Sequence, residues 1–165
     1  MSSLKTYLFD VTDRLFSDTR VGNWCKLPYH NHPKGCPNFG IHNYCPPHAP
    51  SADDFFDLKQ PHWFLITEFN LKSYIDLMRE KHPKWSERRL KCLLYWQGSI
   101  RAMQRKFIAN LRHDNSKLVF SLLPEAMNLN IFKTLIDCNI PFETKPKTKV
   151  LKVALLGYPN STFTT

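Results

Sequence analysis

The stretch from residue 24 to 50, WCKLPYHNHPKGCPNFGIHNYCPPHAP, constrains the fold of this chain more than any other. It holds three cysteines, four histidines and six prolines, and its apolar residues follow neither a helical nor a strand period. A loop of this length within a compact chain is usually functional or disordered, and the aromatic and cysteine content argues against disorder. We therefore expect an ordered loop that is held by something other than secondary structure.

The three cysteines of this stretch are the predicted metal ligands. Cys25, Cys36 and Cys45 follow the spacing C-x10-C-x8-C, and thiolates are preferred ligands of zinc and of iron–sulfur clusters. Proline follows two of these cysteines, and Gly35 and Gly40 allow tight turns around a bound group. The competing interpretation, three ordinary buried thiols, fits a loop so rich in turn residues less well.

The kind of metal is open between two predictions. A four-iron cluster (4Fe-4S) on three cysteines leaves one iron for an external ligand, and we expect an iron–sulfur cluster first. Zinc is the alternative, and a closed structural zinc site would take a fourth ligand from the loop histidines. The candidates for that ligand are His30, His32, His42 and His48. The cysteine spacing does not match the compact pairs of common zinc modules, which favours the cluster.

Two stretches resemble a known family. The segment CPNFGIHNYCPP is similar to the C-x-x-[YF]-G-x4-C-P-P signature of a family of uncharacterised predicted metal-binding proteins, which are thought to hold iron–sulfur clusters. The segment PEAMNLNIFKTLIDCNI, followed by VALLG, looks like that family's Glu-Ala-x-Gly-[IV]-[DN]-[IV] region, from which Asn128 and Leu129 depart. The resemblance implies that Cys36 and Cys45 are ligands. It does not extend to Cys25 or to a second cysteine cluster.

Length and composition favour one domain of the α/β or α+β class. The chain has 165 residues, of which 42% are hydrophobic, and no apolar run is long enough to cross a bilayer. The first residues lack the pattern of a signal peptide, and the odd number of cysteines argues against a disulfide framework. We expect a cytoplasmic protein that does not bind membranes. Its predicted parts are an N-terminal helix within 1–20, a metal-binding loop at 21–61, an α/β core at 62–158 and a tail at 159–165.

The periodicity of the core predicts a small sheet of about three strands packed with helices. Strands are expected at 62–69, 117–123 and 149–157, and helices at 3–17, from Leu71 to a stop at Pro83, from Ser86 to about Arg112, and at 129–138. Asn70 is a predicted helix cap, and Asn139 a predicted left-handed helix exit. Cys92, Cys138 and His62 are predicted to be structural.

Positive charge supplies a second candidate site. The formal net charge is +9, and the predicted helix after Ser86 is strongly basic, with Arg101 and Arg105 one turn apart. The candidate residues for anion or nucleic-acid binding are Arg88, Arg101, Arg105 and Lys34. Glu125 could support a ligand or act as an acid or base. For the helix itself, a solvated basic face whose aromatic side chains point inward is favoured over nucleic-acid binding, because no sequence signature of a nucleic-acid-binding module accompanies the charges.

These observations lead to two main function hypotheses, and a metal-free interaction protein is a third possibility. The first is an iron–sulfur enzyme of a lyase, desulfurase-like or redox type, which activates an anionic or nucleotide-like substrate at an open iron. The second is a non-enzymatic module in which zinc fixes the loop and the basic surface binds nucleic acid or a protein. The sequence does not identify the catalytic residues, the substrate or the oligomeric state.

Overall fold

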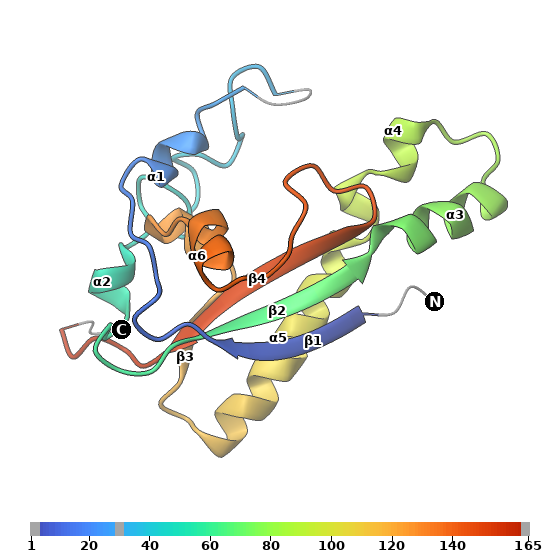
Figure 1. Ribbon diagram of the computed structural model, residues 1–165. Coiled ribbons are helices and arrows are strands. Elements are labelled where there is room, and N and C mark those ends of the chain that lie inside the picture. Colours follow the sequence, from blue (N-terminus) through green and yellow to red (C-terminus); the bar gives the residue numbers. More distant parts are fainter. Residues whose placement is uncertain (1–3, 29–31, 163–165) are drawn as a thin grey trace.

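The computed structural model describes residues 4–28 and 32–162, and it is an α+β fold around a four-stranded antiparallel sheet (Figure 1). The strands are β1 (Leu4–Asp10), β2 (Trp63–Asn70), β3 (Val119–Ser121) and β4 (Lys149–Gly157), in the spatial order β1-β2-β4-β3. The predicted mixed class is confirmed, with four strands in place of about three. The fourth strand is β1, which the sequence predicted as helix.

The predicted N-terminal helix was wrong. Residues 4–10 form an edge strand whose whole length pairs with β2, from Leu4 opposite Phe69 to Asp10 opposite Trp63. The apolar residues of this segment fit a helical period, but Thr6, Tyr7 and Phe9 are strand formers on a short amphipathic segment. Pairing with a long buried neighbour decides between the two patterns, because it satisfies the backbone groups of both strands along the edge that they share.

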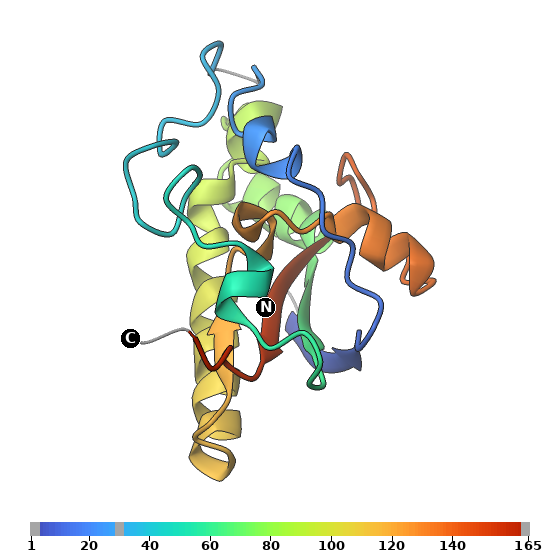
Figure 2. The same ribbon diagram turned by 90° about the vertical axis from the view of Figure 1, so that its left-hand side faces the viewer.

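The two central strands follow the predictions closely, since β4 covers the predicted range and β2 begins one residue later than predicted. Figure 2 shows α5 (Gln97–Asp114) on one side of the sheet and α6 (Ile131–Asp137) on the other. Side chains alternate between these faces: Phe64 and Ile66 of β2 join the core under α6, whereas Leu65 packs with Ile108 of α5. A strand covered on both faces reads as a continuous apolar run, as β2 does.

Two predicted helices are confirmed, together with the residues predicted to cap or end them. Helix α3 (Leu71–Lys81) is capped by Asn70, whose side-chain oxygen accepts a hydrogen bond from the Ser73 amide at 2.9 Å. Helix α6 ends before Asn139, which takes the predicted left-handed conformation with φ +54°. Within the described ranges, no helix is long and apolar enough to cross a membrane.

The predicted long helix from Ser86 to about Arg112 was wrong, because it is split into three. Ser86 caps the short helix α4 (Glu87–Leu90), a 3-10 turn η1 (Leu93–Tyr95) follows, and α5 begins at Gln97. Leu90 and Trp96 are both buried in one cluster with Phe69. A straight helix would turn residues six apart to different sides, so the break lets both reach the same core.

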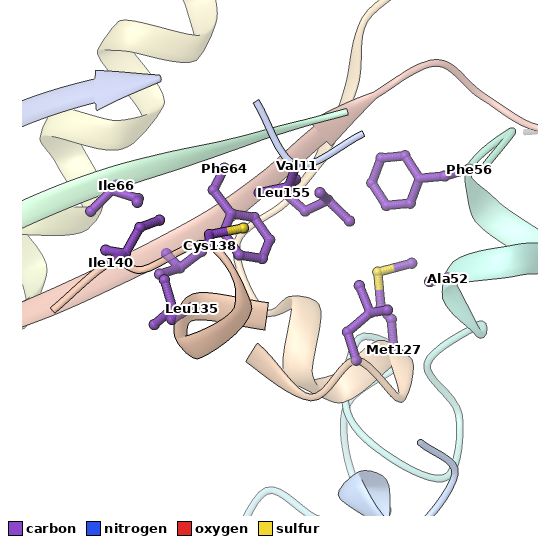
Figure 3. Close-up of a cluster of buried hydrophobic side chains, with 12 residues drawn as sticks. Val11, Ala52, Phe56, Phe64, Ile66, Met127, Leu135, Cys138, Ile140 and Leu155 are labelled. Carbon is purple, nitrogen blue, oxygen red and sulfur yellow. The ribbon is translucent and has the colours of Figure 1, made fainter. Parts of the chain in front are cut away.

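The main core lies between the sheet and the segments that carry α2 (Ala52–Phe55), η2 (Pro124–Met127) and α6. Figure 3 shows its side chains, with the sulfur of Cys138 beside Phe64 and Met127 on the side of Ala52. The prediction of Cys138 as a core residue is confirmed, since it is 7% exposed. Cys92 is only half-buried.

Candidate metal centre

The loop that carries the three cysteines, residues 25–50, is called the cysteine loop below. It starts from α1 (Val21–Trp24), a single turn that packs against η2. Gly22 is buried there, and a Cβ atom on it would lie 2.9 Å from Oδ1 of Asn128. The Asp18 amide also donates a hydrogen bond to the Asn128 carbonyl at 2.7 Å. These contacts fix where the chain enters the loop and thereby place Cys25.

Short backbone hydrogen bonds shape the rest of the cysteine loop. The Cys36 amide donates to the Cys25 carbonyl at 2.7 Å, which brings two residues eleven positions apart into direct contact. The Gly40 amide donates to the Pro46 carbonyl at 2.8 Å and closes the second half. Gly35 and Gly40 have positive φ, as turns of this kind require, and the Pro46–Pro47 peptide bond is cis. The predicted ordered, irregular loop is present in the described part of 21–61, with α1 and α2 as its two helical turns.

The three predicted ligand thiols lie within electrostatic range of one another. All three cysteines are half-buried. Burial raises the pKa of the Cys25 thiol, and negative charge on Cys36, Cys45 and Glu125 raises it further. Burial also raises the pKa of the Cys45 thiol, with further contributions from Cys36 and Glu125. A bound cation would offset the repulsion between these negative charges and would therefore favour the thiolate form of the cysteines.

The three thiols lie in the same region, but their sulfur atoms are not arranged as the ligands of one metal ion. Among residues 4–28 and 32–162, no group of three or more His, Cys, Asp or Glu side chains is arranged so that it could hold a metal ion. The donor chemistry suits zinc or a cluster, and binding would require the three sulfur atoms to converge. The backbone hydrogen bonds of the described part of the loop include those from Cys36 to Cys25 and from Gly40 to Pro46, and none of the three cysteines belongs to a strand of the sheet.

Two of the histidines proposed as a fourth ligand, His42 and His48, contact other groups of the cysteine loop. The His42 ring is stacked on Tyr44 with centroids 5.0 Å apart. Nε2 of His48 lies 3.2 Å from the Gly40 carbonyl oxygen. His32 is half-buried, and His30 lies outside the described residues. The structure also brings the Glu125 carboxylate within electrostatic range of Cys25 and Cys45, and the sequence suggested this residue as a supporting residue or as an acid or base.

The basic candidates do not form one surface. Arg88 lies on α4, and Lys34 is exposed in the cysteine loop before Gly35. Arg101 and Arg105 lie together on α5 and face a cavity that Tyr44 of the cysteine loop also lines. Sequence spacing predicted this pair but not the cavity, because its walls come from segments far apart in the chain.

His62, predicted to be structural, is buried at the start of β2 and 1% exposed. Its amide donates to Oγ1 of Thr12, and its carbonyl accepts from the Val11 amide. The ring packs edge-on against Phe56. The prediction is confirmed, since the residue ties the end of β1 to β2.

Comparisons of this chain with family models, with curated proteins and with solved structures give no match.

Proposed function

We propose that the protein binds a metal centre through Cys25, Cys36 and Cys45. An iron–sulfur cluster is the leading occupant, and zinc is the alternative. Three thiols supply the charge and softness that both occupants need, and the loop that carries them is almost free of helix and strand. A bound metal would supply the fixed point that such a loop otherwise lacks.

The observation that carries this proposal is the meeting of two distant segments. The segments that resemble the metal-binding family, 36–47 and 124–140, are separated by about 80 residues in the chain. In the fold, η2 contacts α1, and Glu125 lies within electrostatic range of Cys25 and Cys45. A shared site is a physical reason for two such segments to be found together.

The asparagine at position 128, which differs from the family pattern, also has a physical explanation. The family pattern has glycine where this chain has Asn128, and glycine is favoured where φ is positive. Asn128 has φ +64°, in the left-handed region that asparagine tolerates better than other side chains. The backbone conformation that the pattern requires is therefore present, and the Asn128 side chain additionally contacts the turn that carries Gly22.

The chemistry that this centre would supply depends on the count of ligands. A four-iron cluster with three cysteines has one iron without a protein sulfur, which could bind an oxygen or sulfur atom of a substrate. Arg101 and Arg105 stand near the end of the cysteine loop and would attract an anionic substrate. These features support an iron–sulfur enzyme of the lyase, desulfurase-like or redox type.

The test is anaerobic purification followed by a visible spectrum and by iron, zinc and sulfide analysis, for the wild type and for Cys36→Ser. Broad brown absorption with iron and sulfide, lost in Cys36→Ser, is expected. Cys92→Ser is the matched control, because that thiol is half-buried outside the cysteine loop, and it should keep its metal. Metal content that is zero, or that is the same in both variants, would overturn the proposal.

The alternative is a zinc-fixed, non-enzymatic module that binds nucleic acid. One observation favours it: Trp85 and Tyr95 stack with centroids 5.1 Å apart beside Arg89, and Tyr95 is 48% exposed. Aromatic faces beside cations bind single strands. This function predicts colourless protein with one zinc and an affinity for a single-stranded oligonucleotide that falls steeply with salt.

A further inference from the structure

A cavity of about 340 Å³ lies between α5, the segment from β3 to η2 and the end of the cysteine loop. Three stretches of chain line it, at 44–55, 101–105 and 120–127. None of the described side chains that line it is acidic. This volume falls within the range of small-molecule sites, which are usually concave, mostly apolar and marked by a few polar groups.

The walls of the cavity are mostly apolar and include three aromatic side chains. Phe55, Phe120 and Leu122 are half-buried around it, and Tyr44 stands at its edge, 60% exposed. Met127 is 5% exposed and belongs both to this wall and to the main core (Figure 3). The core therefore fixes one side of the cavity, and Tyr44, Ala49 and Pro50 of the cysteine loop form another side.

Two guanidinium groups supply the polar part. Arg101 and Arg105 are one helical turn apart on α5 and both line the cavity. In the described part of the chain, neither makes a hydrogen bond or an ion pair with another residue. Arg20 and Arg79, by contrast, each pair with a carboxylate, on Asp18 and on Asp76 and Glu87. The free pair is thus available to an external anion.

We propose that this cavity binds a small anion with a planar ring, which carries a phosphate or a carboxylate. The ring would lie among Phe55, Phe120 and Tyr44, where its apolar faces are removed from water. The anionic group would be held by Arg101 and Arg105, since guanidinium donors match phosphate and carboxylate oxygens in pairs. The proposal goes beyond the metal centre, since no cysteine lines the cavity, although Tyr44, Ala49 and Pro50 of the cysteine loop do.

Fluorescence titration with 8-anilinonaphthalene-1-sulfonate tests this inference, because this probe is itself an aromatic anion. Saturable binding of one probe per chain is expected, and Arg101→Gln combined with Arg105→Gln should weaken it about tenfold or more. Arg112→Gln is the matched control, since Arg112 is exposed on the same helix and does not line the cavity. Near-UV circular dichroism of each variant shows whether the fold is intact.

Displacement of the probe separates the two kinds of anion. Adenosine 5′-monophosphate and 1-naphthoate compete in parallel titrations, and displacement by either supports the proposal and identifies the preferred anionic group. Failure of both to displace the probe, or equal probe affinity in the double arginine variant and the wild type, would overturn it. Metal analysis of the double arginine variant separates this result from the metal proposal, because that variant keeps all three cysteines and should keep its metal while it loses the probe.

Discussion

A Cβ atom on Gly35 would overlap the carbonyl oxygen of Cys25 and would lie 2.8 Å from the carbonyl carbon of Lys26. The two halves of the cysteine loop touch through their backbones at this point, and Gly35 has φ +82°. Contacts this close leave no space for any side chain, and the conformation itself disfavours one. The approach of Cys36 to Cys25 therefore depends on a single glycine.

Replacing this glycine should open the cysteine loop. We expect Gly35→Ala to lower metal loading several-fold and to cost roughly 1–2 kcal/mol from the backbone conformation alone. Metal analysis and urea unfolding measure the two effects. Gly98→Ala is the control, because no atom beyond its chain neighbours and the backbone of its own helix lies within 4 Å of its Cβ position, and alanine favours helix α5. Normal metal content in Gly35→Ala would argue against the role of this contact.

Metal removal should affect the cysteine loop before the sheet. The main core joins β2, β4 and α6 without any of Cys25, Cys36 and Cys45. We expect chelator-treated protein to keep its far-UV circular dichroism but to be cut by trypsin after Lys26 or Lys34, since loss of the metal permits local opening of the segment that holds it. Cleavage sites are identified by mass spectrometry. Identical cleavage with and without metal would contradict this expectation.

A glycine at the end of β4 is required by packing. A Cβ atom on Gly157 would lie 2.6 Å from Cδ2 of His62 and 3.0 Å from Cδ1 of Phe56. These rings belong to a filled interior, so Gly157→Ala should lower the free energy of unfolding by about 1–3 kcal/mol. Equilibrium unfolding in urea measures this change. An unchanged midpoint would mean that the ring of His62 can move aside.

Local signals explain which parts of the fold the sequence predicts. The strands at 63–70 and 149–157 are long, apolar and bounded by turn residues, and Asn70 is a cap that acts within one turn. The strand at 4–10 and the break near Cys92 depend on partners far along the chain. Periodicity within a short window contains no information about such partners, so the same residues fit a helix equally well.

For the candidate site too, the sequence predicts local features but not those that depend on distant parts of the chain. Residue type and spacing single out the three cysteines, and the pair Arg101 and Arg105 follows from helical periodicity. The carboxylate of Glu125 and the cavity beside Tyr44 arise only when residues some 80 positions apart meet. The sequence can therefore identify candidate metal ligands and candidate anion-binding residues, but it does not predict which other groups surround them.

The cap of α3 gives a prediction of modest size. The Asn70 side chain accepts the Ser73 amide, which would otherwise lack a partner at the start of the helix. Asn70→Ala should lower the free energy of unfolding by about 1 kcal/mol. Asn110→Ala, on the exposed face of α5, should change it by less than about 0.5 kcal/mol. Equal effects of the two substitutions would show that the cap contributes nothing specific.

The buried imidazole of His62 should make stability depend on pH. Burial lowers its pKa, although a backbone hydrogen bond at Gln60 and the carboxylates of Asp57, Asp13 and Asp10 act in the opposite direction. Nε2 has no partner among the described atoms, so a proton there would be poorly solvated. The folded protein therefore resists a proton that the unfolded chain accepts below about pH 6.5.

This difference fixes the sign of the effect. Stability from neutral His62 is fully present above about pH 6.5 and is lost as pH falls, because the unfolded state then binds more protons. Urea unfolding between pH 7.5 and 5 should show a decline of up to about 1.4 kcal/mol per pH unit from this group. His62→Phe should flatten the decline, whereas His113→Gln, whose side chain is 89% exposed, should not. Equal slopes in His62→Phe and the wild type would show that His62 is protonated alike in both states.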